Sequence, residues 1–318
     1  MSKKTSASII IPCKDIDDYT RECIAHCKRL KGVSFEILLL PDNATEVIEG
    51  VTTLPTGPVS PGTKRNIGVK NSNGEFCAFI DSDAYPRNDW LSNALKYFVD
   101  PEVGGVGGPG LTPEADGFMQ KAGGYVMSSF MVGNLASRYK AKSCFESDDI
   151  HSCNFISPKV VVEAAGGWNG KYWPGEDTLM CLAIKKLGKK LIESSNVVVY
   201  HHRRSLFKPH LKQVSRFGEH RGFFVKRFPQ NSGKLTYFFP TLLLASLITG
   251  LLLSLFFPFF TYVLLVGVGL YLFSTLIAAA IQIQRIKFVI IVWLGIIVTH
   301  IIYGSYFLSG LIKRDLKR

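Results

Sequence analysis

Short apolar runs alternate with amphipathic segments along the first two hundred residues. The runs at 7–12, 35–41 and 76–80 predict buried strands, because each is short, rich in branched or aromatic residues and followed by a polar turn. Helical patterns at 15–31 and 63–72 separate these runs. Strands that alternate with helices predict an α/β domain with a mainly parallel sheet.

The same alternation continues toward residue 200, although the difference between apolar runs and amphipathic segments is smaller there. An aromatic, glycine-rich loop interrupts it just before Glu176, where a clear helical pattern begins. The remaining expected elements are helices at 89–98 and 116–142, the second interrupted by glycine, and strands at 103–108, 152–157 and 192–200.

The pattern changes after residue 235. Residues 235–284 contain no charged side chain, and residues 288–312 contain none apart from the titratable His300. A membrane-spanning helix needs roughly 20 apolar residues. The two runs therefore predict a C-terminal membrane region, residues 238–318, with about three helical spans at 238–257, 259–281 and 288–312.

Much of the net charge of +12 lies directly before those runs, since residues 203–234 hold nine Lys or Arg and one Glu. A basic segment beside a membrane anchor faces anionic headgroups, so membrane lipids rather than nucleic acid are the expected partner. We assign residues 206–237 to a basic amphipathic segment at the membrane interface. Its apolar face would consist of Phe207, Leu211, Val214, Phe224 and Phe228.

Membrane topology follows from the same features. Residues 7–12 are too few for the apolar core of a signal peptide, so residues 1–237 are expected on the cytoplasmic face of a multi-pass cell-membrane protein. The loop at 282–287 carries two positive charges and would face the cytosol. A third span would place residues 313–318, with four positive charges and one negative, outside, against the positive-inside rule. We favour three spans, although one re-entrant segment would return the tail to the cytosol.

The seven cysteines form no CxxC pair, and their number is odd. Cys23 and Cys27 lie four residues apart on a predicted helix, without a second pair of ligands beside them. Free thiols in the cytosol are therefore expected.

Acidic residues follow two of the predicted strands. Asp42 ends one strand, and Asp81 and Asp83 flank a serine at the end of another. Two carboxylates one residue apart repel each other unless a cation lies between them, and oxygen ligands suit Mg²⁺ or Mn²⁺. A solvated acidic turn is the alternative for this stretch alone. Because ligands of such sheets bind at the carboxyl ends of the strands, the placement of these residues favours a functional site.

Two more positions carry candidate chemistry. Glu176 and Asp177 begin a predicted helix, where the dipole favours carboxylates, so a purely stabilising role is the alternative. His201 and His202 follow the last predicted strand. A neutral imidazole is a common metal ligand, and a solvated histidine pair is the alternative.

Five segments follow one another along the chain: SIIIPCKD, LLLPDN, KRNIGVKNSNGEFCAFIDSDAYP, CNFIS and AAGGWNGKYWPGEDTLMCLAIKKLG. Together they resemble family 2 glycosyltransferases of GT-A fold over about residues 6–205. The resemblance implies a Rossmann-like domain with a mixed sheet that binds a nucleotide sugar, and we assign it residues 1–205. The apolar tail is similar to that of membrane-bound bacterial and archaeal members that build surface polysaccharides or lipid-linked glycans.

The resemblance also implies roles for the matching residues. Asp177 would be the catalytic base, with Glu176 beside it as the second candidate. Asp83 would be the more direct ligand of Mg²⁺ or Mn²⁺, supported by Asp81 and more weakly by His201. Contacts to the donor would come from Asp42, Arg65, Asp81 and Asp15.

The chain departs from the family at two places. The second strand usually ends in a paired-aspartate turn, and here it reads PDNAT, which leaves only Asp42. Downstream, QVSRF is similar to the Gln-x-x-Arg-Trp motif of processive synthases, with Phe in place of Trp. Gln213 and Arg216 thereby become candidate acceptor-binding residues, with a basic membrane-surface helix as the alternative. Trp168 and Trp173 would stack against a sugar or else pack beneath the loop.

The expected function is the inverting, metal-dependent transfer of a hexosyl group from a nucleotide-sugar donor to a lipid-linked or polysaccharide acceptor at the membrane. A processive polysaccharide synthase, a nucleotidyltransferase and a non-catalytic sugar-nucleotide-binding membrane protein are the alternatives. No glycine-rich phosphate loop follows the first strand, which disfavours a nucleotidyltransferase, and the presence of Asp83 and Asp177 disfavours a non-catalytic protein. The sequence leaves open whether the protein forms an oligomer.

Overall fold

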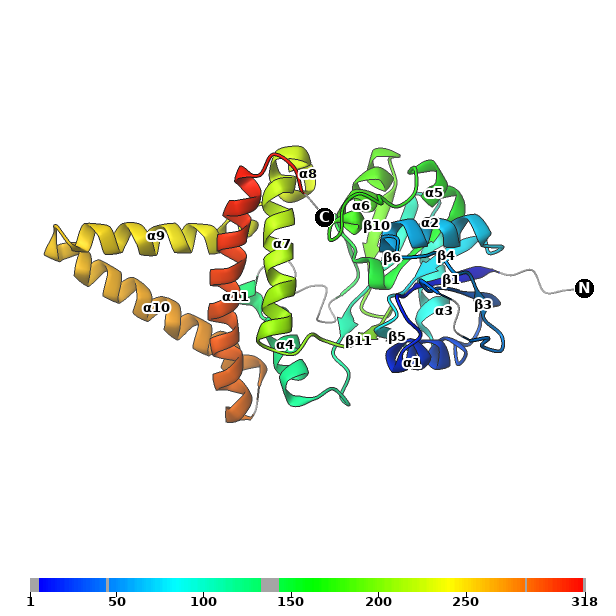
Figure 1. Cartoon of the computed structure of the whole chain (residues 1–318), viewed down its shortest axis with the longest axis horizontal. Helices are drawn as coiled ribbons and strands as arrows, with labels where there is room; N and C mark the ends of the chain where they lie inside the picture. The colour runs from blue at the N-terminus through cyan, green and yellow to red at the C-terminus, as the bar shows by residue number, and fades with distance from the viewer. Residues whose placement is uncertain (1–5, 44–45, 133–142, 284, 317–318) are drawn as a thin grey trace, which may run out of the picture. The chain divides into compact units, whose positions relative to one another are not determined.

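Figure 1 shows a computed structural model of the chain, which describes residues 6–43, 46–132, 143–283 and 285–316. The chain divides into two compact units. The first unit comprises Met1–Pro113 and Lys140–His202, and the second comprises Glu114–Tyr139 and Arg203–Arg318. Residues 114–132, which lie in the range that we expected for the catalytic domain, thus cluster with the C-terminal helices.

The first unit is built on an eight-stranded sheet of order β3-β2-β1-β4-β9-β6-β10-β8. Its pairs β1–β2, β2–β3, β1–β4 and β6–β10 are parallel, and the pairs that involve β9 or β8 are antiparallel. The expected mixed sheet is therefore confirmed. The strands are β1 (Ala7–Pro12), β2 (Phe35–Leu40), β3 (Thr52–Thr53), β4 (Phe76–Phe79), β6 (Val103–Gly107), β8 (Phe145–Glu146), β9 (Phe155–Pro158) and β10 (Lys190–Glu193).

A second, three-stranded sheet pairs β11 (Val199–His201) with β5 (Ala84–Pro86) and β7 (Gly110–Leu111). The single strand predicted at 192–200 is thus two strands, because a turn between β10 and β11 moves the chain to the second sheet. The antiparallel register sets His201 opposite Ala84, one residue after Asp83. This short sheet therefore brings a late part of the chain to the acidic turn that follows β4.

The helices of the first unit begin where the sequence supplies caps. The Asp17 carboxylate accepts a hydrogen bond from the Thr20 backbone N–H at the start of α1, and Ser60 does the same for Thr63 at the start of α2, with Pro61 as its first residue. The helix predicted at 89–98 is α3 followed by a 3₁₀ turn. The helices are α1 (Asp18–Cys27), α2 (Pro61–Asn71), α3 (Trp90–Leu95), α5 (Lys159–Ala164) and α6 (Glu176–Lys186).

Apolar side chains are buried on both faces of the main sheet. One cluster includes Ile9 and Ile11 of β1, and the other includes Ile10, so successive residues of this strand serve opposite faces. The predicted strands at 35–41 and 76–80 are buried in the same way. The cysteines are free thiols, as expected, and all except Cys144 are buried.

The second unit is helical within the described residues. The helix predicted at 116–142 is α4 (Phe118–Ser128) in its first part, while its residues 133–142 lie outside the described part of the chain. Two helices, α10 and α11, are long and apolar enough to cross a membrane, whereas α9 has only 16 residues. The other helices are α7 (Lys208–Arg227), α8 (Pro229–Ser232), α9 (Phe239–Ser254), α10 (Pro258–Gln282) and α11 (Ile286–Ile312).

Helices α7 and α11 lie side by side and run in the same direction (Figure 1). His210 and Thr299 form a hydrogen bond of 2.9 Å at one end of the contact, and the Lys226 ammonium donates to the Lys313 carbonyl at the other. A Cβ atom at Gly222 would lie 2.0 Å from the Phe307 carbonyl oxygen. The missing side chain therefore lets the two backbones approach closely.

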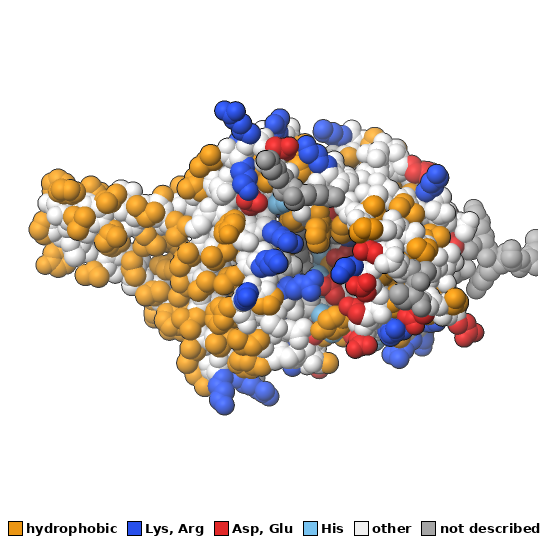
Figure 2. Space-filling view, in the orientation of Figure 1, with side chains coloured by type: hydrophobic (Ala, Val, Ile, Leu, Met, Phe, Trp, Pro, Cys, Tyr) orange, Lys and Arg blue, Asp and Glu red, His pale blue; other side chains and the backbone are white. Residues whose placement is uncertain are grey.

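Helices α9 and α10 form a hairpin that extends away from α11 (Figure 1). Its base rests on α11, where the Thr241 hydroxyl donates to the Gly304 carbonyl and the Trp293 indole N–H donates to the Leu272 carbonyl. Its surface is covered by hydrophobic side chains (Figure 2). The hairpin tip, Leu255 to Phe259, is among the most exposed apolar parts of the chain.

We expect Gly222→Ala to lower the melting temperature of the detergent-solubilised protein, because the added methyl group would overlap the backbone of α11. A cost of about 1–3 kcal/mol is typical of overpacking. Gly267→Ala in α10 is the matched control, since nothing lies within 4 Å of its Cβ position. The control should be neutral or slightly stabilising. Equal melting temperatures for Gly222→Ala and the wild type would show that the close α7–α11 contact is absent.

Candidate active site

Three potential metal ligands converge at the end of β4. Asp81 and Asp83 lie on the turn between β4 and β5, and His201 comes from the paired strand β11. One ligand atom from each lies within 4.8 Å of the others, and the His201 Nε2 atom is 3.1 Å from the Asp83 carboxylate. All three side chains are partly exposed. The structure thus brings together the three residues that the sequence proposed for a metal site.

The donor set of this cluster fits a hard divalent cation. Two carboxylates supply anionic oxygen, which Mg²⁺ and Mn²⁺ prefer, and imidazole is accepted more readily by Mn²⁺ than by Mg²⁺. Partial exposure leaves room for further ligands from a diphosphate or water. The residues present can therefore hold Mn²⁺, or Mg²⁺ less readily.

Arg65 connects this cluster to the start of α6. Its guanidinium is 2% exposed and donates to Asp81 at 2.7 Å, to Glu176 at 3.0 Å and to the Ser152 hydroxyl at 2.9 Å. The guanidinium also lies over the Trp168 ring, 4.9 Å from its centroid. One cation thus fixes residues from the turn after β4, the 3₁₀ turn before β9, and α6 around a common point.

Glu176 is one of the fixed residues and is nearly inaccessible. Its side chain is 5% exposed, and burial raises the pKa of Glu176 to about 7, while Arg65 opposes the shift by favouring the charged form. A buried carboxyl held by an arginine cannot reach an acceptor molecule without breaking that pair. The geometry therefore gives Glu176 a positioning role.

Asp177 is the next residue on α6 and is oriented differently. Its side chain is half-buried, and its Oδ1 atom accepts a hydrogen bond of 2.8 Å from the Thr178 backbone N–H. Neighbouring residues of a helix point in different directions, so Glu176 can pair with Arg65 while Asp177 is more exposed. Of the two adjacent acids, Asp177 is the one with access to the surface of the unit.

Lys64 is a residue that the sequence reasoning missed. Its ammonium group is buried and donates to the Cys13 and Leu40 carbonyls and to the Asp42 carboxylate. It thereby joins the ends of β1 and β2 and holds Asp42, the predicted donor contact, at the carboxyl edge of the sheet. The signal was present in the sequence, since Lys64 directly precedes Arg65 on a helix that packs against these strands.

The remaining candidates in the first unit lie in different environments. Asp15 is exposed in the loop after β1, near Lys14. Trp168 is buried against Phe79 and Arg65, so its environment supports packing rather than contact with a sugar. Trp173, in contrast, is 52% exposed in the loop before α6. Trp173 is therefore the tryptophan of this loop that can stack on a ligand.

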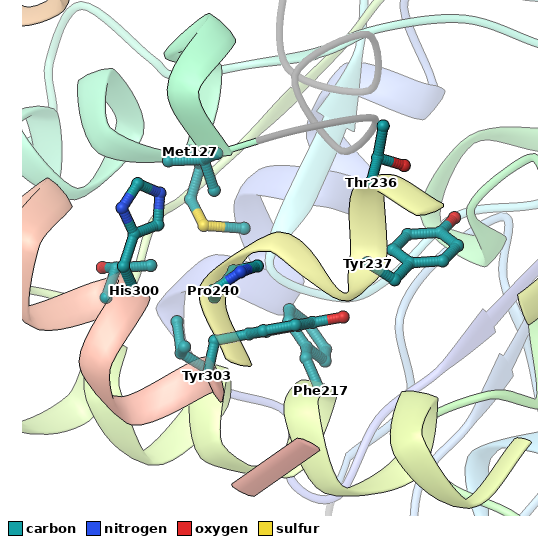
Figure 3. A pocket seen from close by; sticks show the side chains of 10 residues that line it. Met127, Phe217, Thr236, Tyr237, Pro240, His300 and Tyr303 are labelled. Atoms are coloured by element: carbon teal, nitrogen blue, oxygen red, sulfur yellow. The ribbon is translucent and has the colours of Figure 1, made fainter. Parts of the chain in front are cut away.

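Gln213 and Arg216 lie on α7 in the second unit, Gln213 half-buried and Arg216 exposed. Phe217, the aromatic residue of the same QVSRF segment, lines a mostly apolar cavity with about 30 Å³ of free space, room for one water-sized group (Figure 3). Met127, Tyr237, Pro240, His300 and Tyr303 surround it (Figure 3). The motif aromatic thus faces the interior of the helical unit.

Known proteins with similar sequences support the predicted family. Residues 8–155 match the family model described as Glycosyl transferase family 2. A dolichyl N-acetyl-alpha-D-glucosaminyl phosphate 3-beta-D-2,3-diacetamido-2,3-dideoxy-beta-D-glucuronosyltransferase of Methanococcus voltae is 23% identical over 273 residues, 78% of this chain and 83% of that protein. The poly(ribitol-phosphate) beta-N-acetylglucosaminyltransferase TarS of Staphylococcus aureus is 28% identical over 107 residues, 29% of this chain and 18% of that protein.

A solved mannosyltransferase of Pyrobaculum calidifontis, in complex with GDP-Man and Mn²⁺, shares the fold. Its TM-score is 0.67 at 14% identity, over 99% of this chain and 89% of that chain. Residues 8–155 thus match glycosyltransferase family 2, the family that the sequence motifs predicted. The chain is a glycosyltransferase with a GT-A domain followed by helices, two of which are long and apolar enough to span a membrane.

We expect Arg65→Met to destabilise the protein by about 3–5 kcal/mol, because it leaves the buried Glu176 carboxyl and the Asp81 carboxylate without their cation. Arg87→Met is the matched control, since Arg87 pairs with Asp89 at the surface. Loss of that exposed pair should cost less than about 1 kcal/mol. Denaturant unfolding of the two variants measures the difference, and equal losses would contradict a central role for Arg65.

Proposed function

We propose that this protein is an inverting, metal-dependent glycosyltransferase that moves a sugar from a nucleotide-sugar donor to a lipid-linked or polysaccharide acceptor at the membrane. One observation carries the proposal. The Asp81, Asp83 and His201 cluster and the N-terminus of α6, with Asp177, are held at one site by the guanidinium of Arg65. A metal-binding group and a candidate base are thereby fixed on the same carboxyl edge of the sheet.

The donor side of the reaction needs the charge of a diphosphate to be neutralised. A divalent cation on Asp83, Asp81 and His201 would supply that neutralisation. Asp42, held by Lys64 at the end of β2, is positioned at the same sheet edge to contact the base or ribose of the donor. Arg65 is buried and donates to Asp81, Glu176 and Ser152, so we assign it to positioning these groups rather than to direct contact with the donor.

The acceptor side of the reaction needs a base. An acceptor hydroxyl must lose its proton as it attacks the anomeric carbon, and a carboxylate next to it takes that proton. Asp177 is our choice, because Glu176 is buried and paired with Arg65. A single base without a second nucleophile fits one displacement step, in which the anomeric configuration inverts.

The proposed acceptor is membrane-associated. The Methanococcus relative is named as acting on a dolichyl phosphate-linked sugar and the TarS relative on poly(ribitol-phosphate). The apolar helices α10 and α11 and the basic helix α7 are consistent with work at a bilayer surface. We favour transfer to a lipid-linked acceptor, since the similarity to the Methanococcus protein extends over most of both chains.

The packing of α11 on α7 bears on membrane topology. Helix α7 carries seven charged side chains in 20 residues and cannot cross hydrocarbon. Because α11 runs alongside α7 from Thr299 to Lys313, its second half must lie at the same depth. We therefore propose that the α9–α10 hairpin enters the bilayer, while α7 and α11 lie along its cytosolic surface. The basic tail then stays in the cytosol, which removes the conflict that three spans create.

We expect Asp177→Asn to lower turnover by about 10²–10⁴-fold, because the amide keeps the shape of the side chain but cannot accept the proton. Affinity for a nucleoside diphosphate should change little, as measured by calorimetry. Turnover is followed as nucleoside diphosphate release from UDP- and GDP-sugars with Mn²⁺ and a polyprenyl phosphate. Asp18→Asn, in the first turn of α1, is the control. Near-wild-type turnover of Asp177→Asn would assign the base elsewhere.

Labelling of single cysteines tests the topology. Cys144 is the exposed cysteine, so Cys144→Ser gives a background in which Arg314→Cys or Val99→Cys adds one reactive thiol. Both should resist a membrane-impermeant maleimide in intact cells and react after permeabilisation. If only Arg314→Cys reacts in intact cells, the result would support three membrane spans. If Val99→Cys reacts as well, the catalytic unit would lie outside the cell.

A further inference from the structure

A chain of polar contacts continues behind His201, on the side of the ring away from Asp83. The His201 Nδ1 atom is 3.5 Å from the Cys153 sulfur, and the same sulfur is 2.8 Å from the His151 Nδ1 atom. The His151 Nε2 atom lies 2.9 Å from the Gly108 carbonyl oxygen. The candidate metal ligand is thus connected to the backbone through a buried thiol and a second imidazole.

The chemistry of these groups fixes where each proton lies. The Gly108 carbonyl can only accept, so the His151 Nε2 atom carries a proton and donates. In a neutral imidazole the other nitrogen is then an acceptor, and it can take the Cys153 S–H bond. The sulfur in turn accepts from His201, which places the His201 proton on Nδ1. The Nε2 atom that faces Asp83 therefore keeps its lone pair for a cation.

Packing holds the backbone at Gly108 and the turn that carries Cys153 in place. A Cβ atom at Gly108 would lie 2.1 Å from the Val197 carbonyl oxygen, so the backbone there is enclosed on the side where a side chain would begin. Cys153 itself is 2% exposed, in a 3₁₀ turn that Asn154 anchors through hydrogen bonds to Trp90 and to the Val197 carbonyl. The same turn presents Ser152 to Arg65.

We propose that Cys153 and His151 are positioning residues that hold His201 in the Nδ1–H tautomer and orient its Nε2 atom toward the cation. The proposal rests on the metal site of the proposed function and extends it to two residues outside that site. Outer partners of metal-ligating histidines set their tautomer and orientation, and their loss typically weakens metal binding by about 10–100-fold.

Direct ligation by the thiol does not fit this geometry. The sulfur contacts Nδ1, whereas Asp83 faces Nε2, so the thiol and the Asp83 carboxylate lie at different nitrogens of the His201 ring. A hard cation held by carboxylates also gains little from a thiol ligand. Cys153 is therefore placed to act through His201.

The test measures Mn²⁺ binding to the full-length protein in detergent, by the electron paramagnetic resonance signal of free Mn²⁺, with UDP or GDP present. Cys153→Ala and His151→Phe should each raise the dissociation constant by about 10-fold or more. Cys153→Ser keeps a donor and an acceptor and should recover part of the affinity. Cys77→Ala is the matched control, because Cys77 is equally buried but contacts Ser72.

Each outcome decides between explanations. Dissociation constants within twofold of wild type for both Cys153→Ala and His151→Phe, in protein with normal melting temperatures, would overturn the positioning role. An equal loss in Cys77→Ala would assign the effect to general packing and would also overturn it. If wild-type protein binds no Mn²⁺ with either nucleotide, the metal site itself fails, and this inference fails with it. Cd²⁺ binding that is tighter than Mn²⁺ binding, and that loses this advantage in Cys153→Ser, would identify the thiol as a ligand. That result would overturn the positioning role.

Discussion

The buried guanidinium of Arg65 is the interaction on which the site depends. It is desolvated, which is costly, and the cost is offset because Asp81, Glu176 and Ser152 all accept its hydrogen bonds. Its Nε atom is buried without a hydrogen-bond partner among the described residues, so the pairing is close to complete but not perfect. Three segments far apart in sequence are thereby fixed at one edge of the sheet. The positions of the cluster of Asp81, Asp83 and His201 and of Asp177 both follow from this constraint.

Much of this edge could be predicted from the sequence. Asp42 and Asp81 follow β2 and β4, which both pair in parallel with β1, and parallel strands end at the same edge of a sheet, so the placement of both residues at one edge follows from topology alone. His201 was a weaker candidate, because β5 and β7 have only three and two residues, too short to show a period. Adjacent acids such as Glu176 and Asp177 cannot be told apart by pattern, since their roles depend on which one faces Arg65. His151 and Cys153 act through contacts that no local pattern encodes, whereas Lys64 could have been found from its place beside Arg65.

The hydropathy pattern predicted the helices of the C-terminal region but not their arrangement. The runs of apolar residues correspond to α9, α10 and α11, although α9 is shorter than the predicted span. What the pattern could not contain is the neighbour of each helix. Helix α11 packs on the charged helix α7, with contacts from His210–Thr299 to Lys226–Lys313, and this contact limits where α11 can lie. Composition alone treats such a helix as equivalent to α10.

The α9–α10 hairpin also has a consequence for how the protein is made. From Phe238 to Ile283 it carries no charged side chain, and its turn consists of apolar residues. Helices α9 and α10 can therefore enter a bilayer together without moving a charge or a folded segment through hydrocarbon. Insertion of such a hairpin needs no translocation of a polar domain, so it can follow release of the finished polypeptide from the ribosome. The catalytic unit, which precedes the hairpin in the chain, would have time to fold before the anchor is inserted.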